Sequence, residues 1–413
     1  MKKKRILLAA PPFGGHLHPI LGIAKGLSSD FEVLMLSTPS GVLQATECGL
    51  NGVEVLKEFE ADVWKISEPA TNVQNNPFYL FRQLKLNVSL MSKMETDAEK
   101  VLEEFKPDLV IADFTVPVVG RVAERLNIPW WTTLPSPCVF ETPDGPPAYF
   151  GGLKPAKNFA QSLQYGGLRG LTRLFKSSMF QIFKKEFRSL GFEAVYRVDG
   201  TEAVYSPLKV WALGIIELEF KRSYPPQFEI IGPVLYSPEH PLSDLKFDTS
   251  FEFRVLVTLG THLTHQKKQM TDRLKEIANR HPKILFHFTH GKVNSELGTQ
   301  LANYREFDFI SYDQHLHNYD LVVHHGGSGV LYHCLKRAIP ALIFPLDFDQ
   351  FDNAARAEVA GIAIWVRHLD QLEASLIAAL KNESLKIHCK KMATTLSNYD
   401  AVARLRLEVQ KLK

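Results

Sequence analysis

Short apolar runs alternate with stretches of helical spacing along most of this chain. In the first half the apolar runs lie at 6–10, 32–37, 109–112 and 129–133. The runs at 6–10 and 109–112 are almost continuously apolar, as expected of strands buried on both faces of a parallel sheet. Parallel strands need long crossovers, which are usually helices, and the stretches 17–27 and 118–126 have helical spacing. The alternation therefore predicts βαβ units and an α/β fold.

The same alternation resumes in the second half after a polar, proline-bearing segment at 237–250. Its apolar runs lie at 254–259, 284–288, 307–311, 321–323, 339–344 and 362–366. A chain of 413 residues exceeds the size at which one core keeps growing. We therefore predict two Rossmann-like domains, 1–236 and 251–413, joined by a linker at 237–250, with parallel sheets facing across a cleft.

Composition excludes several classes of protein. Apolar residues make up 45% and the formal net charge is +3, which is too small to indicate a nucleic-acid partner. The basic and apolar start at 1–10 is cut off by Pro11 and Pro12, before it reaches the length of an export signal. No apolar stretch approaches a membrane span. The four cysteines are scattered without CxxC spacing, so we expect reduced thiols and a cytoplasmic protein.

The segment 321–350 combines an apolar strand, a glycine turn and a helix. The turn carries His324, His325 and the run 326–329, and the next strand ends near Asp349 and Gln350. A strand that enters a helix through a glycine turn presents free N–H groups and the positive end of the helix dipole. If the bound anion is a diphosphate, the acid and the amide beside it can bind hydroxyls. The combination suggests a sugar nucleotide.

The segment 168–190 mixes apolar and basic residues at helical spacing. Two interpretations are open: a surface helix that packs one face on its domain, or an interfacial helix in contact with an anionic membrane. The surface helix is favoured, because such helices are common in soluble domains.

Four segments together resemble the family 1 nucleotide-sugar glycosyltransferases. HHGGSGVLYHCLKRAIPALIFPLDFDQFDNAARAEVAGIAI at 324–364 is similar to their donor-binding signature. PPFGGHLHPILGIAKGL, PDLVIADFTVPVVGRVAERLNIP, and IGPV followed by VLVTLGT after the linker occur in the expected order. The resemblance, which is to bacterial MGT-like UDP-glycosyltransferases, implies the two-domain GT-B fold. We also expect the last helix to pack back on the N-terminal domain.

The resemblance implies an inverting enzyme that needs neither a metal nor a cofactor. It would transfer a hexose, glucose from UDP-glucose, to a hydroxyl of a small lipophilic acceptor. Carotenoids, macrolides, phenols and sterols all fit. The aromatic-rich middle (Trp130, Trp131, Phe140, Tyr149, Phe150, Phe159) could line an acceptor pocket, and core packing explains these residues equally well.

His16 matches the histidine that serves as general base in the family, in Gly15-His16-Leu17-His18-Pro19. A helix amino terminus disfavours the imidazolium, so we expect His16 to be neutral. Asp113 ends a strand on the same predicted edge and by resemblance hydrogen-bonds the base. The alternatives are that His16 only caps its helix, that His18 is the base, and that Asp113 is a helix N-cap.

By resemblance the donor is held by residues of the second half and Gly15. His325, Gly326 and Gly327, helped by Gly260 and Thr261, would hold the diphosphate, and Asp349 and Gln350 the sugar. The other expected donor-binding residues are Tyr312 against the base, Gln314, Ser328, Gly329, Val330 and His333. The family usually has Ser or Thr in place of Val330, for a phosphate contact, and Glu in place of His333, for the ribose.

Competing motifs fit less well. Gly326 to Val330 lacks the last glycine of the nucleophile elbow G-x-S-x-G, and the first turn lacks the dehydrogenase fingerprint G-x-G-x-x-G. Asp347-Phe348-Asp349 spells DxD, but it follows a glycine turn and is interpreted as sugar recognition. The pairs 262/265, 287/290 and 315/317 lack a third metal ligand. A sugar-nucleotide epimerase or hydrolase of the same fold, and a non-catalytic nucleotide-sugar-binding paralogue, remain as alternatives.

Overall fold

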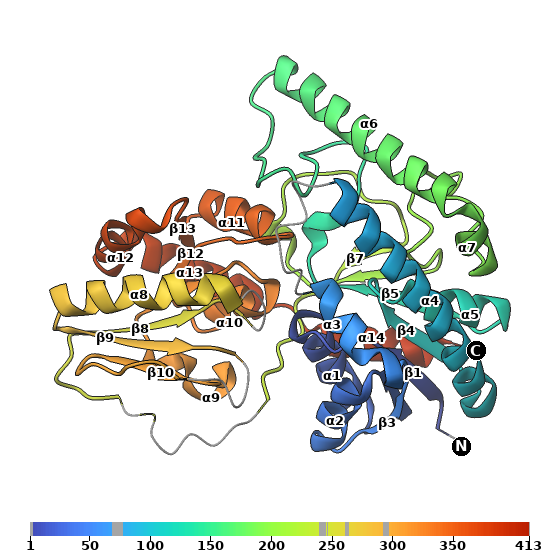
Figure 1. Ribbon diagram of the computed structural model, residues 1–413, viewed down its shortest axis with the longest axis horizontal. Helices are drawn as coiled ribbons and strands as arrows, with labels where there is room; N and C mark the ends of the chain where they lie inside the picture. Colours follow the sequence, from blue (N-terminus) through green and yellow to red (C-terminus); the bar gives the residue numbers. More distant parts are fainter. Residues whose placement is uncertain are drawn as a thin grey trace.

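The computed structural model describes residues 3–67, 77–238, 245, 247–260, 264–291 and 297–412. It contains two parallel sheets that lie side by side, each covered by helices on both faces (Figure 1). The predicted α/β class with two Rossmann-like sheets is confirmed.

The first sheet belongs to the N-terminal half. Its strands are β1 (Arg5–Ala9), β2 (Glu32–Ser37), β3 (Asn51–Glu54), β4 (Leu109–Asp113), β5 (Trp130–Leu134), β6 (Val210–Ala212) and β7 (Phe228–Ile230). They are parallel in the order β3-β2-β1-β4-β5-β6-β7. The order reverses between β1 and β4, and ligands of open α/β sheets bind beside the carboxyl ends of strands at such a point.

The six strands of the second sheet have the same order as the first six strand positions of the first sheet. Its strands are β8 (Phe253–Thr258), β9 (Ile284–Thr289), β10 (Tyr304–Phe307), β11 (Leu321–His324), β12 (Ala341–Ile343) and β13 (Ala363–Trp365). They are parallel in the order β10-β9-β8-β11-β12-β13, so the reversal falls between β8 and β11. The strand predicted at 307–311 is wrong: β10 ends at Phe307, and Ile310 turns into the core before a short helix.

Alternate residues of β1 enter two apolar layers. Ile6 and Leu8 pack with the apolar face of α1 (Gly14–Leu27). Leu7 and Ala9 pack on the other side of the sheet with α4 (Pro77–Phe105) and α5 (Pro117–Arg125). Because both faces are covered, the apolar run is continuous rather than alternating. The other helices of this half are α2 (Pro39–Glu47), α3 (Glu60–Ser67), α6 (Phe159–Ile182) and α7 (Lys184–Ser189).

Helices likewise cover both faces of the second sheet. They are α8 (Thr264–Arg280), α9 (Tyr312–His315), α10 (Ser328–Lys336), α11 (Gln350–Val359), α12 (Leu372–Leu380) and α13 (Glu383–Leu396). Short 3₁₀ segments lie at Lys57–Phe59, Pro137–Val139, Ile216–Leu218, Leu316–Asn318 and Leu369–Gln371. Within the described ranges, no helix is long and apolar enough to cross a membrane.

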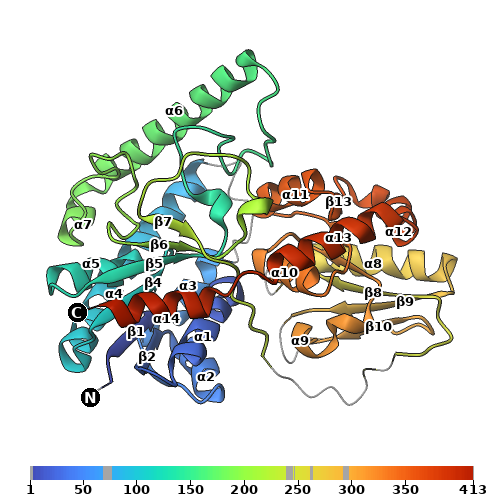
Figure 2. The same cartoon turned by 180° about the vertical axis from the view of Figure 1, so that it is seen from behind.

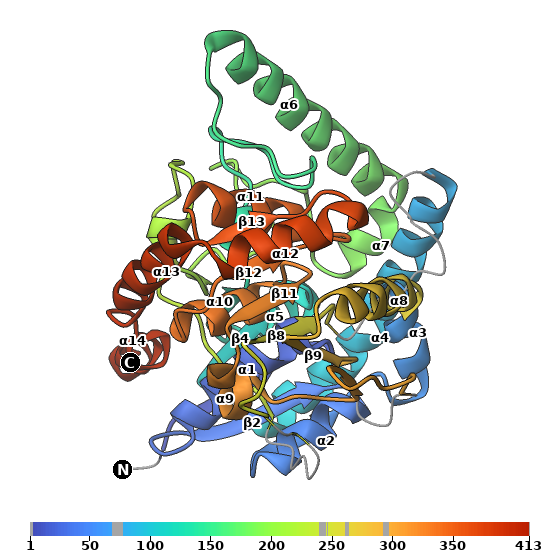
Figure 3. The ribbon, with the colours of Figure 1, turned by 90° about the vertical axis from the view of Figure 1, so that its left-hand side faces the viewer.

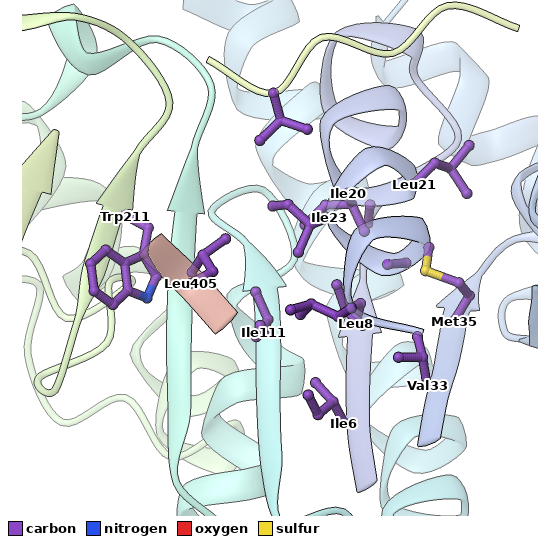
Figure 4. Packing of buried hydrophobic residues seen from close by; sticks show 14 of the residues in the cluster. Ile6, Leu8, Ile20, Leu21, Ile23, Val33, Met35, Ile111, Trp211 and Leu405 are labelled. Atoms are coloured by element: carbon purple, nitrogen blue, oxygen red, sulfur yellow. The ribbon is translucent and has the colours of Figure 1, made fainter. Parts of the chain in front are cut away.

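The sequence predicts one final helix over residues 384–412. The structure instead has two helices there, α13 and α14 (Ala401–Lys411). The Asp400 side chain accepts a hydrogen bond from the Ala403 N–H at 2.9 Å, which caps α14 and starts a new helix. The chain thereby returns to the first half, where α14 crosses one face of the first sheet, the near face in Figure 2. Leu405 is fully buried in the cluster that contains Ile111 and Trp211 (Figure 4).

Two leucines of α14 offer a matched test of this packing. Leu405 is fully buried, whereas the side chain of Leu407 is 55% exposed. We expect Leu405→Ala to lower the free energy of unfolding by about 2–5 kcal/mol, because it removes a packed side chain and leaves a cavity. Leu407→Ala should change it by less than about 0.5 kcal/mol. Urea denaturation measures both, and equal costs would contradict the packing of α14 on the first half.

Candidate active site

The carboxyl-end edges of the two sheets face each other, and the amino termini of α1 and α10 meet there. A cavity of about 10 Å³ lies between them, lined by Gly15 and Pro19 of α1 and by Ser328 and Gly329 of α10, among others. Such a volume holds about one water molecule. Side-chain oxygens cap neither helix, so the positive ends of both dipoles point into this narrow space.

His16 and Asp113 are brought together by adjacent strands. His16 is in the first turn of α1, directly after β1, and Asp113 is the last residue of β4. The His16 Nδ1 atom lies 3.0 Å from Asp113 Oδ1. Asp113 is buried, and its Oδ1 also accepts a hydrogen bond from the Thr115 N–H at 2.9 Å. The fixed Nδ1 contact leaves His16 Nε2 as the nitrogen that can accept a proton.

The contact with Asp113 adds an effect that the argument from the helix end does not include. Burial opposes protonation, but the charge of Asp113, its hydrogen bond and the charge of Asp349 together raise the pKa of His16 above its usual value. The carboxylates favour the imidazolium, whereas the helix end opposes it. Asp349 belongs to the second half of the chain, so its charge acts on His16 across the cleft.

His18 lies in a different environment from His16. Its ring packs edge-on against Tyr236, with 5.9 Å between the ring centroids. Burial lowers the pKa of His18 to about 4, even though Gln44 hydrogen-bonds it, and the neighbouring His333 lowers the pKa further. The sequence alone left His18 as a competitor for the role of base. Of the two histidines, His16 is the one that contacts the strand-end carboxylate.

The glycine turn after β11 folds tightly around His325. A Cβ atom on Gly260, in the turn after β8, would lie 2.9 Å from the His325 ring, and one on Gly327 would lie 2.5 Å from it. Gly326 has a φ of +94°, and its N–H donates to His324 Nδ1 at 3.0 Å. Only glycine fits this backbone. Gly260, His325, Gly326 and Gly327 are therefore brought together as predicted, while Thr261 lies outside the described residues.

Asp349 and Gln350 lie at the start of α11, beside the glycine turn. Asn353 links the two features, because its Nδ2 donates to Gly326 O at 2.9 Å and to Asp349 Oδ2 at 3.2 Å. Gln350 Oε1 accepts hydrogen bonds from the N–H groups of Leu346 and Asp347, at 2.8 and 3.1 Å. In this structure the oxygen of the Gln350 amide therefore holds its own loop.

Ser136 is a residue of the cleft that the sequence pattern did not single out. Its hydroxyl donates to Asp349 Oδ2, and the Ser328 hydroxyl donates to Pro135 O at 2.8 Å. The loop after β5 therefore touches both the predicted sugar-binding acid and the first turn of α10. Its position after the strand 130–134 was the available signal, because that strand ends on the same edge as β1 and β4.

The predicted base-binding and ribose-binding residues, Tyr312 and His333, contact each other. The Tyr312 hydroxyl is 3.0 Å from Thr258 Oγ1, and its ring packs edge-on against His333. His333 is buried, and burial lowers its pKa to about 4 although Asp313 lies nearby. Val330 packs in an apolar cluster, and Gln314 is exposed on α9.

Buried ion pairs join the two halves beside the cleft. Arg356 of α11 donates to Glu219 Oε2 at 3.0 Å, and Arg222 donates to the same oxygen at 2.9 Å. The Tyr149 N–H donates to Asp352 Oδ2 at 2.9 Å. Burial raises the pKa of Asp352 to about 6. Since breaking a buried pair costs about 3–5 kcal/mol, these contacts hold the halves in one arrangement.

The His16 pKa provides a test of the site that needs no substrate. We expect NMR titration of the imidazole nitrogens to show a His16 pKa above the usual value, and a lower pKa in Asp113→Asn. The substitution removes the charge that offsets burial, so the change must be downward. The pKa of His18 should stay near 4 in both proteins. A His16 pKa that is unchanged in Asp113→Asn would contradict the contact.

Comparison with known families adds a match in the second half. Residues 254–405 match the model of the glycosyltransferase family 28 C-terminal domain. The match begins in β8 and ends in α14, so it contains the glycine turn and the residues at the start of α11.

Curated relatives that match the chain are UDP-glucuronosyltransferases. UDP-glucuronosyltransferase 3A1 of Xenopus laevis is 26% identical over 69% of this chain and 57% of its own length. UDP-glucuronosyltransferase 1A1 of Mus musculus is 22% identical over 94% of this chain and 78% of its own length. The chain spans only 57%, 57% and 55% of the length of three of these relatives.

Solved structures of glycosyltransferases share the fold over the whole chain. The kitacinnamycin glycotransferase has a TM-score of 0.78 at 19% identity, with complete coverage of both chains. A Streptomyces sp. SF2575 glycosyltransferase complexed with thymidine diphosphate has a TM-score of 0.64 at 16% identity, with 99% of each chain covered. At this identity the likeness concerns the fold alone.

Proposed function

We propose that this chain, which belongs to the family 1-like UDP-glycosyltransferases, transfers a hexose from a nucleotide sugar to a hydroxyl of a small lipophilic acceptor. The donor is UDP-glucose, and the transfer inverts the anomeric configuration. The supporting observation is that a histidine–carboxylate pair on one half faces the predicted sugar-binding acid of the other, close enough for Asp349 to influence the pKa of His16.

His16 acts as the general base. Its Nδ1 donates to Asp113, so Nε2 presents a lone pair to the acceptor hydroxyl. As Nε2 takes the proton, the hydroxyl oxygen forms a bond to the anomeric carbon and the bond from that carbon to the diphosphate oxygen breaks. The proton then passes from His16 to solvent. Asp113 stabilises the imidazolium that forms, and it does so from a buried position where the charge interaction is strong.

The turn after β11 receives the leaving diphosphate. The uncapped start of α10, the N–H groups of the glycine turn and His325 lie together there, and positive potential at this point stabilises the growing negative charge. Asp349 orients the sugar hydroxyls. In this structure Asp349 accepts a hydrogen bond from Ser136, so a bound sugar hydroxyl would take the place of the Ser136 hydroxyl.

Two positions depart from the nucleotide-binding pattern of the family. Val330 is buried in an apolar cluster, and His333 is enclosed by Tyr312 and Asp313, so neither presents the hydroxyl or carboxylate that family members place there. Two related structures are described as complexes with thymidine diphosphate and with DTDP. UDP and thymidine diphosphate donors are therefore both worth testing, with UDP-glucose as the expected substrate.

A panel of donors and acceptors tests the proposed reaction directly. We expect UDP-glucose to release UDP only when an alcohol or phenol acceptor is present, because Nε2 of His16 acts on a hydroxyl held in the cleft. Released nucleotide and glycosylated product are measured together by liquid chromatography. Loss of donor without an acceptor would favour a hydrolase or epimerase, and binding without turnover a non-catalytic paralogue; both outcomes contradict transfer.

Substitution of the two histidines separates the base from its competitor. His16→Ala should lower kcat/KM by roughly 10²–10⁴-fold, the usual contribution of a general base, whereas His18→Ala should retain most activity. In wild type the rate should rise as pH increases through the raised pKa of His16, because only the neutral imidazole accepts a proton. In Asp113→Asn that rise should move to lower pH. Full activity of His16→Ala would show that the base lies elsewhere.

A further inference from the structure

Helix α6 exposes apolar side chains to solvent from its first turn to its last. Its exposed large hydrophobic residues range from 44% exposed at Phe175 to 82% at Phe159. The others are Leu163, Leu171, Leu174 and Ile182. These four are separated by eight, three and eight positions, a spacing that places them on the same side of an α-helix.

The opposite face of α6 carries charge and is the face that packs on the protein. Arg173 forms an ion pair with Glu141, and Lys176 forms ion pairs with Glu141 at 3.2 Å and with Glu202 at 2.8 Å. A surface helix of a soluble domain usually buries its apolar stripe and exposes its charges. As the favoured sequence interpretation expects, α6 packs one face on its domain. However, the face that packs is the charged one, and much of the apolar stripe is exposed to solvent.

The exposed face of α6 lies at the outer edge of the molecule. Figures 1 and 3 show the helix projecting from the N-terminal half, with the described elements on one side of it. Contiguous apolar patches larger than a few hundred Å² are rare on monomeric proteins and mark interaction sites. A 24-residue helix with such a stripe is a long, narrow surface of this kind.

The charge around this face is strongly positive. The segment 154–190 contains eight basic residues (Lys154, Lys157, Arg169, Arg173, Lys176, Lys184, Lys185 and Arg188) and a single acidic one, Glu186. Lys157 precedes the helix, and Lys184 and Lys185 follow it. Over the residues that the structure places, these three lysines make no ion pair. The apolar stripe is therefore bounded by unpaired positive charge at both ends.

We propose that α6 docks this protein on the surface of an anionic lipid bilayer. The stripe would lie at the boundary between headgroups and acyl chains, with Lys157, Lys184 and Lys185 against the lipid phosphates. A second copy of the chain fits less well. A two-fold pairing of α6 with itself would place like-charged ends against each other in either helix orientation. This inference does not depend on the proposed glycosyl transfer.

Co-sedimentation of the full chain with vesicles tests the proposal. Binding is expected to phosphatidylcholine vesicles that contain phosphatidylglycerol, with much weaker binding to phosphatidylcholine alone. Leu171→Gln with Leu174→Gln should weaken binding by about tenfold or more, because two apolar contacts are lost. Lys184→Glu with Lys185→Glu should weaken it by at least about fivefold per lysine, and only for the anionic vesicles.

A matched control separates the stripe from exposed hydrophobic residues in general. Ile387 on α13 and Leu407 on α14 are 63% and 55% exposed, similar to Leu171 and Leu174. Ile387→Gln with Leu407→Gln should bind vesicles as wild type does. Circular dichroism and thermal unfolding confirm that each variant is folded.

Three results would overturn the proposal. Wild-type protein could fail to bind anionic vesicles, or the Leu171→Gln, Leu174→Gln variant could bind them equally well. In the third, light scattering shows that wild type is a dimer and that the Leu171→Gln, Leu174→Gln variant is a monomer, while wild type does not bind the vesicles. That outcome would identify the stripe as an interface between copies of the chain.

Discussion

The buried contact between Arg356 and Glu219 holds the two halves of this molecule in register. The side chains of both residues are 2–3% exposed, and Arg222 shares the same carboxylate. Ile215 and Leu218 of the first half pack with Leu331 of the second beside this pair. Because the cleft is formed by residues from both halves, every distance across it depends on these contacts and on α14, which ties the chain's end to the first sheet.

The same arrangement explains the electrostatics of the cleft. Asp113 and Asp349 come from different sheets, and both favour the protonated form of His16 against the cost of burial. The amino ends of α1 and α10 face each other, so the cleft combines negative side chains with positive backbone ends. In the proposed reaction the imidazole gains positive charge and lies beside carboxylates. The diphosphate gains negative charge and lies beside the positive end of a helix. Residues of both halves therefore stabilise the charges that develop in the proposed reaction.

The sequence predicted the parallel sheets well, because continuous apolar runs and intervening helices leave few topologies open. It also placed His16 and Asp113 on one edge, since β1 and β4 are neighbours at the reversal of strand order. It could not predict contacts that depend on how the halves meet, such as Ser136 with Asp349. It also could not predict the influence of Asp349 on the pKa of His16, because Asp349 comes from the other half of the chain. The exposed stripe of α6 was likewise hidden, because amphipathic spacing does not say which face is buried.

A crystal structure with a bound nucleoside diphosphate tests the central claim most directly, namely that one half holds the donor while the other supplies the base. The diphosphate is expected at the glycine turn and the start of α10, with the position of the transferred sugar between Asp349 and His16 Nε2. A diphosphate bound at the start of α1, or one whose sugar position lies away from His16, would contradict this division of roles.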